Sequence, residues 1–323
     1  MPEGHESWPE LPFGTWRETY ATLHMYTQIV GKIRLALSPM ANHWWQVPLY
    51  VTARGLTTSP IPYGDRIFEI DFDLFDHQLI IQTCDGDISR IALGSSVRDF
   101  YREVVGSMHR LGIDVKIWTR PVEVPDPIPF EEDDRHSTYV PADALRFWQV
   151  LRRVDRVFHV FRGRFTGKSS PVHFFWGSFD LAVSRFSGRH ADPKPDADLI
   201  TRVAYNAEQS SLGFWPGGGE INGAAFYSYI YPPSAAFEHQ AVRPEVAFWH
   251  SGLGEFLMMY DDVRNADDPA SMILDFAQST YEAGARLQGW PVDELHLTAS
   301  ARIGFGPRSA LAVSKTPKAG GQS

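Results

Sequence analysis

The sequence predicts an α+β protein of two related halves, each a mainly antiparallel sheet packed with helices. Short segments that alternate apolar and polar residues are separated by turns rich in glycine and proline, as in antiparallel sheets. Each set of such segments follows a long segment with apolar residues at every third or fourth position, which indicates a helix. The same order of features also occurs twice along the chain.

The first half is expected to hold a helix, a run of strands and a second helix. In chain order these are a helix over 16–37, a strand over 47–53, an alternating segment over 66–77, strands over 79–83 and 88–93, and a helix between Ser96 and Gly112. Asp85-Gly86, between two of the strands, is typical of a hairpin turn.

A connector between the halves is indicated by four prolines within residues 121–129, followed by an acidic cluster. The expected organisation is an N-terminal extension over 1–14, the first half over 15–120, the connector over 121–138, the second half over 139–297 and a disordered C-terminal tail over 298–323.

The second half again starts with a long helix, for which Pro141 suits the first helical position. The later elements are a strand after Gly177-Ser178, a helix over about 197–212, a glycine-rich turn over 213–220, strands near 224–231, 245–250 and 255–260, and a helix starting at Asp268-Pro269. In the first of these strands, alternation separates Leu181 and Val183 from Asp180, Ala182 and Ser184.

The repeated order is a long helix, Gly-Lys, Ser-Pro, a histidine followed by two aromatic residues, and an alternating strand. The histidine is His43 in the first half and His173 in the second. Internal duplication explains this order, and coincidence in an aromatic-rich chain is the alternative. Under duplication, His43 and His173 face each other across a groove between the halves.

Composition excludes several classes of protein. The chain has 30 basic and 39 acidic residues and a formal net charge of -9, which argues against a nucleic-acid partner. The lone Cys84 cannot form an internal disulfide, and no signal peptide or membrane-length apolar segment is present. A cytoplasmic location is therefore expected.

Familiar catalytic motifs are missing from the sequence. Gly163 to Ser169 resembles a phosphate-binding loop, but it has three residues between its glycines where that motif needs four, and it follows a helix. There is no GxSxG, HExxH, CxxC or GxGxxG motif, and the sequence leaves the cofactor unknown.

Asp71, Asp73 and His77 are the candidate metal ligands. The two carboxylates lie two residues apart on one strand face and the imidazole lies in the following turn, so they can converge on a divalent cation. The alternative is a solvated outer face of an antiparallel strand.

The candidate site combines residues from the two histidine segments with the glycine-rich turn. His43, His173 and Asp180 are the candidate catalytic residues, which hold or move a proton. Trp44, Trp176, Arg185, Trp215 and Glu220 are the candidate ligand-binding residues. Structural alternatives are buried, hydrogen-bonded histidines and an ion pair between Asp180 and an arginine.

Several long phrases, including NHWWQVPLYVTARGLTTSPIPYG, FEIDFDLFDH, SPVHFFWGSFDLAVSRFSGR, GFWPGGGE and FYSYIYP, resemble a bacterial family of unknown function of the DUF5996 type. The resemblance covers roughly residues 8–297. It implies that the two halves do not fold independently of each other. It implies no activity, cofactor or catalytic residue.

Three functions follow from these patterns. The preferred one is an enzyme acting on a small polar or anionic molecule in an aromatic, histidine-containing cleft between the halves, with Arg185 holding the anion. The second is a small-ligand binding or sensor protein without catalysis. The third is a homodimer whose aromatic surfaces meet without any ligand.

Overall fold

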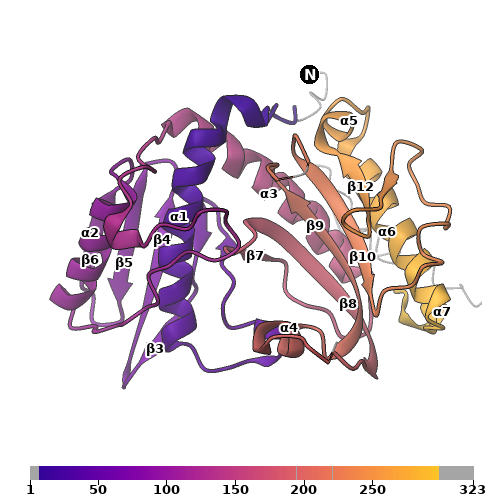
Figure 1. Cartoon of the computed structure of the whole chain (residues 1–323), viewed down its shortest axis with the longest axis horizontal. Helices are drawn as coiled ribbons and strands as arrows, with labels where there is room; N and C mark the ends of the chain where they lie inside the picture. The colour runs from indigo at the N-terminus through magenta and orange to yellow at the C-terminus, as the bar shows by residue number, and fades with distance from the viewer. Residues whose placement is uncertain (1–6, 194, 220, 298–323) are drawn as a thin grey trace, which may run out of the picture.

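The computed structural model describes residues 7–193, 195–219 and 221–297, which form two antiparallel six-stranded sheets and seven helices (Figure 1). The two sheets lie beside each other, the first with the purple strands and the second with the red-to-orange strands (Figure 1). The predicted α+β class with antiparallel sheets is confirmed. The predicted tail over 298–323 lies outside the described residues.

The first sheet has the strand order β1-β2-β4-β5-β6, and β3 pairs with the first part of β4. Its strands are β1 (Tyr50–Val51), β2 (Gly55–Thr57), β3 (Ile61–Tyr63), β4 (Arg66–Asp73), β5 (Gln78–Thr83) and β6 (Ile88–Ala92). Phe68, Ile70 and Phe72 of β4 are buried, as their alternation predicts. Gly86 takes the positive φ that the predicted hairpin between β5 and β6 requires.

Helices α1 (Phe13–Leu37) and α2 (Val97–Arg110) belong to the first half. The Ser96 side chain caps α2 by accepting from the Asp99 amide (3.2 Å), as expected. Helix α1 begins three residues before the predicted start at residue 16. Tyr26 of α1 stacks on Phe100 of α2 with ring centroids 3.9 Å apart, which joins the two helices.

The second sheet has the order β11-β12-β10-β9-β8-β7. Its strands are β7 (His173–Phe175), β8 (Asp180–His190), β9 (Ala207–Trp215), β10 (Ala225–Tyr231), β11 (Phe248–His250) and β12 (Glu255–Met259). Helices α3 (Pro141–Gly163) and α6 (Pro269–Leu287) pack against one face. The short elements are η1 (Asn42–Trp44), η2 (Phe130–Glu132), α4 (Leu199–Ala204), α5 (Tyr260–Arg264) and α7 (Val292–Leu295).

The helix predicted over about 197–212 is wrong. Helix α4 ends at Ala204, and residues 207–215 form β9, in the middle of the second sheet. Leu212 and Phe214 are buried in the main hydrophobic core, while Ser211 and Gly213 are the small residues of the opposite face. A strand buried on both faces loses the clean alternation by which strands are recognised, so its pattern resembled a helix.

The two sheets are joined at β1 and β7. Leu49, just before β1, and Phe174 of β7 exchange two backbone hydrogen bonds of 2.8 Å each. One hydrophobic core runs through both halves and includes Tyr26, Phe147 and Phe174. The halves therefore share a core, which favours cooperative folding of the chain as one unit.

Candidate functional site

The face of the second sheet turned away from α3 and α6 carries a cavity of about 580 Å³. Its size is that of a small-molecule site, for which roughly 300–1,000 Å³ is typical. We call it the carboxyl cavity, and its ionisable, polar and large aromatic lining residues are His43, Trp45, Glu123, His173, Phe175, Ser178, Asp180, Ser184, Phe186, Tyr205, Gln209, Ser211, Trp215, Tyr227, Tyr229 and Glu255.

Asp180, the first residue of β8, is the most buried acid of this cavity. Its carboxylate accepts hydrogen bonds from the Ser178 and Tyr227 hydroxyls. Burial raises the pKa of Asp180, and the two hydrogen bonds partly offset that rise. Both hydroxyls are neutral, so neither balances the negative charge of the ionised Asp180 carboxylate.

Two further acids face the same cavity. Burial raises the pKa of Glu255 on β12 to about 7, and the negative charge of Asp180 adds to the rise. Burial and Asp180 also raise the pKa of Glu123 in the connector. Three carboxyl groups that affect one another therefore share one cavity, a pattern typical of functional sites.

The tyrosines Tyr227 and Tyr229 of β10 form an aromatic row beside these acids, with ring centroids 6.1 Å apart. The Tyr229 hydroxyl is within 3.0 Å of the Tyr205 hydroxyl. Gly213 of β9 makes room for the row, since a Cβ at that position would lie 2.1 Å from the Tyr227 ring. The glycine thus lets Tyr227 cross β9 and reach Asp180.

His43 reaches the cavity from η1, where its backbone has a positive φ of 55°. Its Nδ1 lies 3.1 Å from the Ala204 carbonyl oxygen and must donate to it. Its Nε2, 2.7 Å from Lys168 Nζ, then accepts from the ammonium group. Burial lowers the pKa of His43, with a smaller contribution from Lys168, so the imidazole is neutral and both nitrogens are engaged.

His173 lies in β7 and lines the same cavity. Burial lowers its pKa to about 3, so it is neutral at physiological pH. Its Nδ1 has no hydrogen-bond partner among the described residues, and such buried polar atoms call for an explanation. The ring of His173 thus lines the cavity, while its unpartnered Nδ1 is itself buried.

Asp180 and Arg185 do not form a site together. Arg185 is fully buried on the opposite face of the sheet, where its guanidinium lies 3.5 Å from the centre of the Phe161 ring and donates to the Phe161 carbonyl. The expected role of Arg185 as an anion holder therefore has no structural basis. None of the described residues that line the carboxyl cavity is lysine or arginine, and the Lys168 ammonium lies behind its wall, 2.7 Å from His43 Nε2 and 4.7 Å from the centre of the Phe186 ring.

The four other candidate ligand-binding residues have different places. Trp215 lines the cavity, whereas the Trp44 indole donates to the Ile200 carbonyl (2.9 Å) and its neighbour Trp45 lines the cavity instead. Trp176 is buried against Gly31 of α1. The contact is so close that a Cβ at Gly31 would lie 2.2 Å from the Trp176 ring. Glu220 lies outside the described residues.

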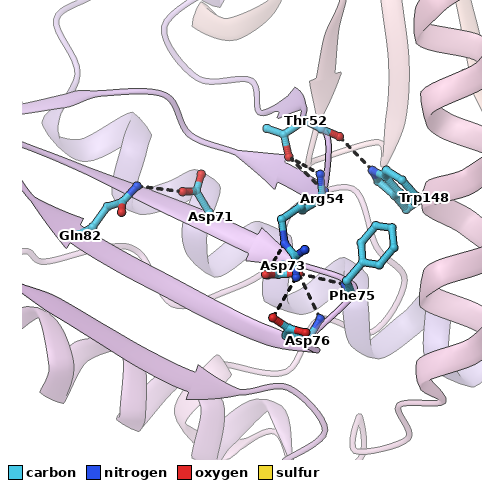
Figure 2. Close-up of polar contacts among 9 residues, drawn as sticks. Thr52, Arg54, Asp71, Asp73, Phe75, Asp76, Gln82 and Trp148 are labelled. Atoms are coloured by element: carbon cyan, nitrogen blue, oxygen red, sulfur yellow. Dashed lines mark hydrogen bonds and ion pairs between the residues drawn. The ribbon is translucent and has the colours of Figure 1, made fainter.

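The three candidate metal ligands are engaged separately. Arg54 donates to Asp73 (2.7 Å) and Asp76 (2.9 Å), and Gln82 donates to Asp71 (3.2 Å) (Figure 2). The His77 ring forms a hydrogen bond with the Tyr139 hydroxyl. Within the described part of the chain, no three His, Cys, Asp or Glu residues gather as a metal site. Asp71, Asp73 and His77 therefore do not form the metal site that the sequence predicts.

Three residues that define the cavity, Tyr227, Glu255 and Glu123, are not among the candidates that the sequence predicts. The alternating tyrosines of FYSYIY indicate one aromatic strand face, so Tyr227 was recognisable in principle. Glu255 starts a short strand and Glu123 lies in the proline-rich connector. Neither has a distinctive sequence neighbourhood, because only the fold brings them to Asp180.

Fold and site together define an α+β protein of two antiparallel sheets with a carboxyl-lined, aromatic cavity on the second. The chain belongs to the DUF5996 family, a family of unknown function, whose model matches residues 8–297. No curated protein and no solved structure matches the chain. Among the described helices, none is long and apolar enough to cross a membrane.

Proposed function

We propose that the protein is an enzyme that moves a proton on a small polar molecule carrying a cationic group, such as an amine, bound in the carboxyl cavity. The observation that carries this proposal is the meeting of Asp180, Glu123 and Glu255 in one cavity without a lysine or arginine in its described lining. A cationic ligand favours the ionised forms of these carboxyl groups, whose pKa values burial raises.

Glu255 is the proposed acid and base. A group that exchanges a proton works best when its pKa lies near the working pH, and the pKa of Glu255 is about 7. Its carboxylate takes a proton from the ligand, and the resulting carboxylic acid returns one. Asp180, held by Ser178 and Tyr227, orients the ligand cation.

The histidines have supporting roles in this proposal. Both are neutral, and the two ring nitrogens of His43 are already engaged by Lys168 and Ala204. His43 therefore holds α4 and the aromatic wall in place. The neutral ring of His173 forms part of the cavity wall against which the ligand packs.

The test exposes the protein to a mixture of cellular small molecules and analyses the mixture by mass spectrometry before and after incubation. We expect an amine-containing compound to be consumed by the wild type and not by Glu255→Gln. The same compound should still be retained by Glu255→Gln on size-exclusion. The proposal is contradicted if Glu255→Gln consumes every compound that the wild type consumes.

A binding or sensor protein is the second candidate function. The rigid row of Tyr227 and Tyr229 favours it, because flat rings hold a ligand at little entropic cost. In this case the wild type retains a compound without changing it, and Trp215→Ala weakens retention more than Glu255→Gln does. The third expectation, a homodimer, predicts a dimer in sedimentation experiments.

We also propose that the two halves arose by duplication. In each half a long helix precedes a sheet whose strands follow one another largely in chain order. Leu49 and Phe174, which pair across the sheets, follow the ends of α1 and α3 by similar lengths of chain. Profile comparison of the two halves over many family members tests this, and a lack of similarity above chance contradicts it.

A further inference from the structure

A second cavity, of about 600 Å³, adjoins the carboxyl cavity. Glu123, Ser178 and Trp215 line both cavities and so form a common boundary. Three prolines of the connector line the second cavity as well, and we call it the proline-walled cavity.

The boundary is built with unusual backbone geometry. Glu123 has a positive φ of 56°, which is rare for a residue with a long side chain and is often kept at functional sites. Its carboxylate packs on Gly177, where a Cβ would lie 2.5 Å from Glu123 Oε1. The connector thus holds an acid between the two cavities, next to the turn that precedes Asp180.

The two cavities differ in charge. Arg17 and Arg135 line the proline-walled cavity and are exposed, and neither forms an ion pair with any residue that the structure describes. Arg135 only donates to the Asp126 carbonyl (3.3 Å), and Arg17 lies 5.4 Å above the Phe13 ring. Besides the shared Glu123, the described residues of this lining include one acid, Asp126.

The glycine-rich segment gives the second cavity its shape. Gly217, Gly218 and Gly219 all have positive φ values, of 108°, 113° and 58°. A Cβ at Gly218 would lie 3.2 Å from Phe13, and one at Gly219 would lie 3.4 Å from Trp215. The bare backbone therefore passes close to both rings and leaves the space between them open.

We infer that the two cavities form one two-part site for an elongated molecule. Its cationic group occupies the carboxyl cavity, an apolar middle passes Trp215, and an anionic group lies beside Arg17 and Arg135. This inference rests on the proposed function, because the cationic end uses the same carboxylates. It adds the class of ligand, a molecule with an amine at one end and an acid at the other.

The test measures binding of two matched series of probes by calorimetry. The first series is 4-aminobutanoate, 6-aminohexanoate and 8-aminooctanoate, and the second is butylamine, hexylamine and octylamine. At the length that spans the boundary, the amino acid is expected to bind at least about tenfold more tightly than the amine of equal length. Arg17→Gln and Arg135→Gln should each remove most of this gain, whereas Arg90→Gln, at an exposed position on β6, should not.

The outcomes separate the two proposals. If amines bind and no amino acid binds more tightly, the two-part site is wrong and the proposed function stands. If the gain is present but survives both arginine variants, the assignment of the anionic end is wrong. If no amine and no amino acid binds, both proposals fail. Thermal unfolding of each variant confirms that it is folded.

Discussion

The Tyr227 hydroxyl on β10 donates a hydrogen bond to the Asp180 carboxylate on β8, across the intervening strand β9. Strands two places apart in a sheet are about 10 Å from each other, so the tyrosine spans this distance only by lying over β9. Gly213, which pairs with Tyr227 and with Ala182, leaves the necessary space. Three neighbouring strands thus cooperate to hold one buried acid.

Tyr227→Phe is expected to lower the free energy of unfolding by about 1–3 kcal/mol, because the buried Asp180 loses a donor. It should also raise the pKa of Asp180 further, since the lost hydrogen bond stabilised the charged form. Urea unfolding and a carbon-13 NMR titration of the carboxyl group measure the two effects. An unchanged pKa would show that the hydroxyl does not stabilise this carboxylate.

Gly213→Ala is expected to destabilise the protein by about 1–3 kcal/mol, because the new methyl group overlaps the Tyr227 ring. Gly163→Ala is the matched control, as no atom lies within 4 Å of its added Cβ. Urea unfolding compares both variants with the wild type. Equal stability of the two variants would contradict the crossing of β9 by Tyr227.

Arg185→Met is expected to destabilise the fold by about 2–4 kcal/mol while leaving amine affinity unchanged within about twofold. The guanidinium packs among Phe161, Phe165 and Tyr281, on the side of the sheet away from the cavity. Chemical unfolding and calorimetry provide the two readouts. A large loss of affinity in a folded Arg185→Met protein would place the arginine in the site after all.

Glu255 makes stability depend on pH in a definite direction. Its folded pKa, about 7, lies above its value in the unfolded chain, so the folded state binds the proton more tightly. The stabilisation is complete below the unfolded pKa and is lost as the pH rises through about 7. Relative to the wild type, Glu255→Gln should gain up to about 3 kcal/mol between roughly pH 4 and pH 8. Chemical unfolding at several pH values measures this, and a difference that does not vary with pH contradicts it.

The sequence predicted local structure well where one pattern dominated. Phe68, Ile70 and Phe72 alternate cleanly and are buried on one face of β4, and Ser96 caps α2 as its position indicates. It failed at β9, where burial on both faces and small residues removed the alternation. At β9 the local sequence pattern favoured a helix, whereas burial on both faces favoured a strand in the middle of the sheet, and the segment forms the strand.

The candidate site was predictable only in part, for a geometric reason. His43, His173, Asp180 and Trp215 do line one cavity, but Arg185 is separated from Asp180 by the sheet itself. The five-residue spacing of Asp180 and Arg185 along one strand puts their side chains on opposite faces. Glu123 and Glu255 come from distant parts of the chain, and only the tertiary fold brings them to Asp180.

The most direct test of the account is the affinity of hexylamine for the protein as a function of pH, measured by calorimetry. A cationic ligand stabilises an ionised carboxylate, so affinity should rise with pH up to about 7 and level off above it. In Glu255→Gln the affinity should be weaker and its rise smaller, because only Asp180 and Glu123 still titrate in the cavity. A wild-type affinity that is independent of pH, or equal to that of Glu255→Gln, would contradict the carboxyl cavity as the site of a cationic ligand.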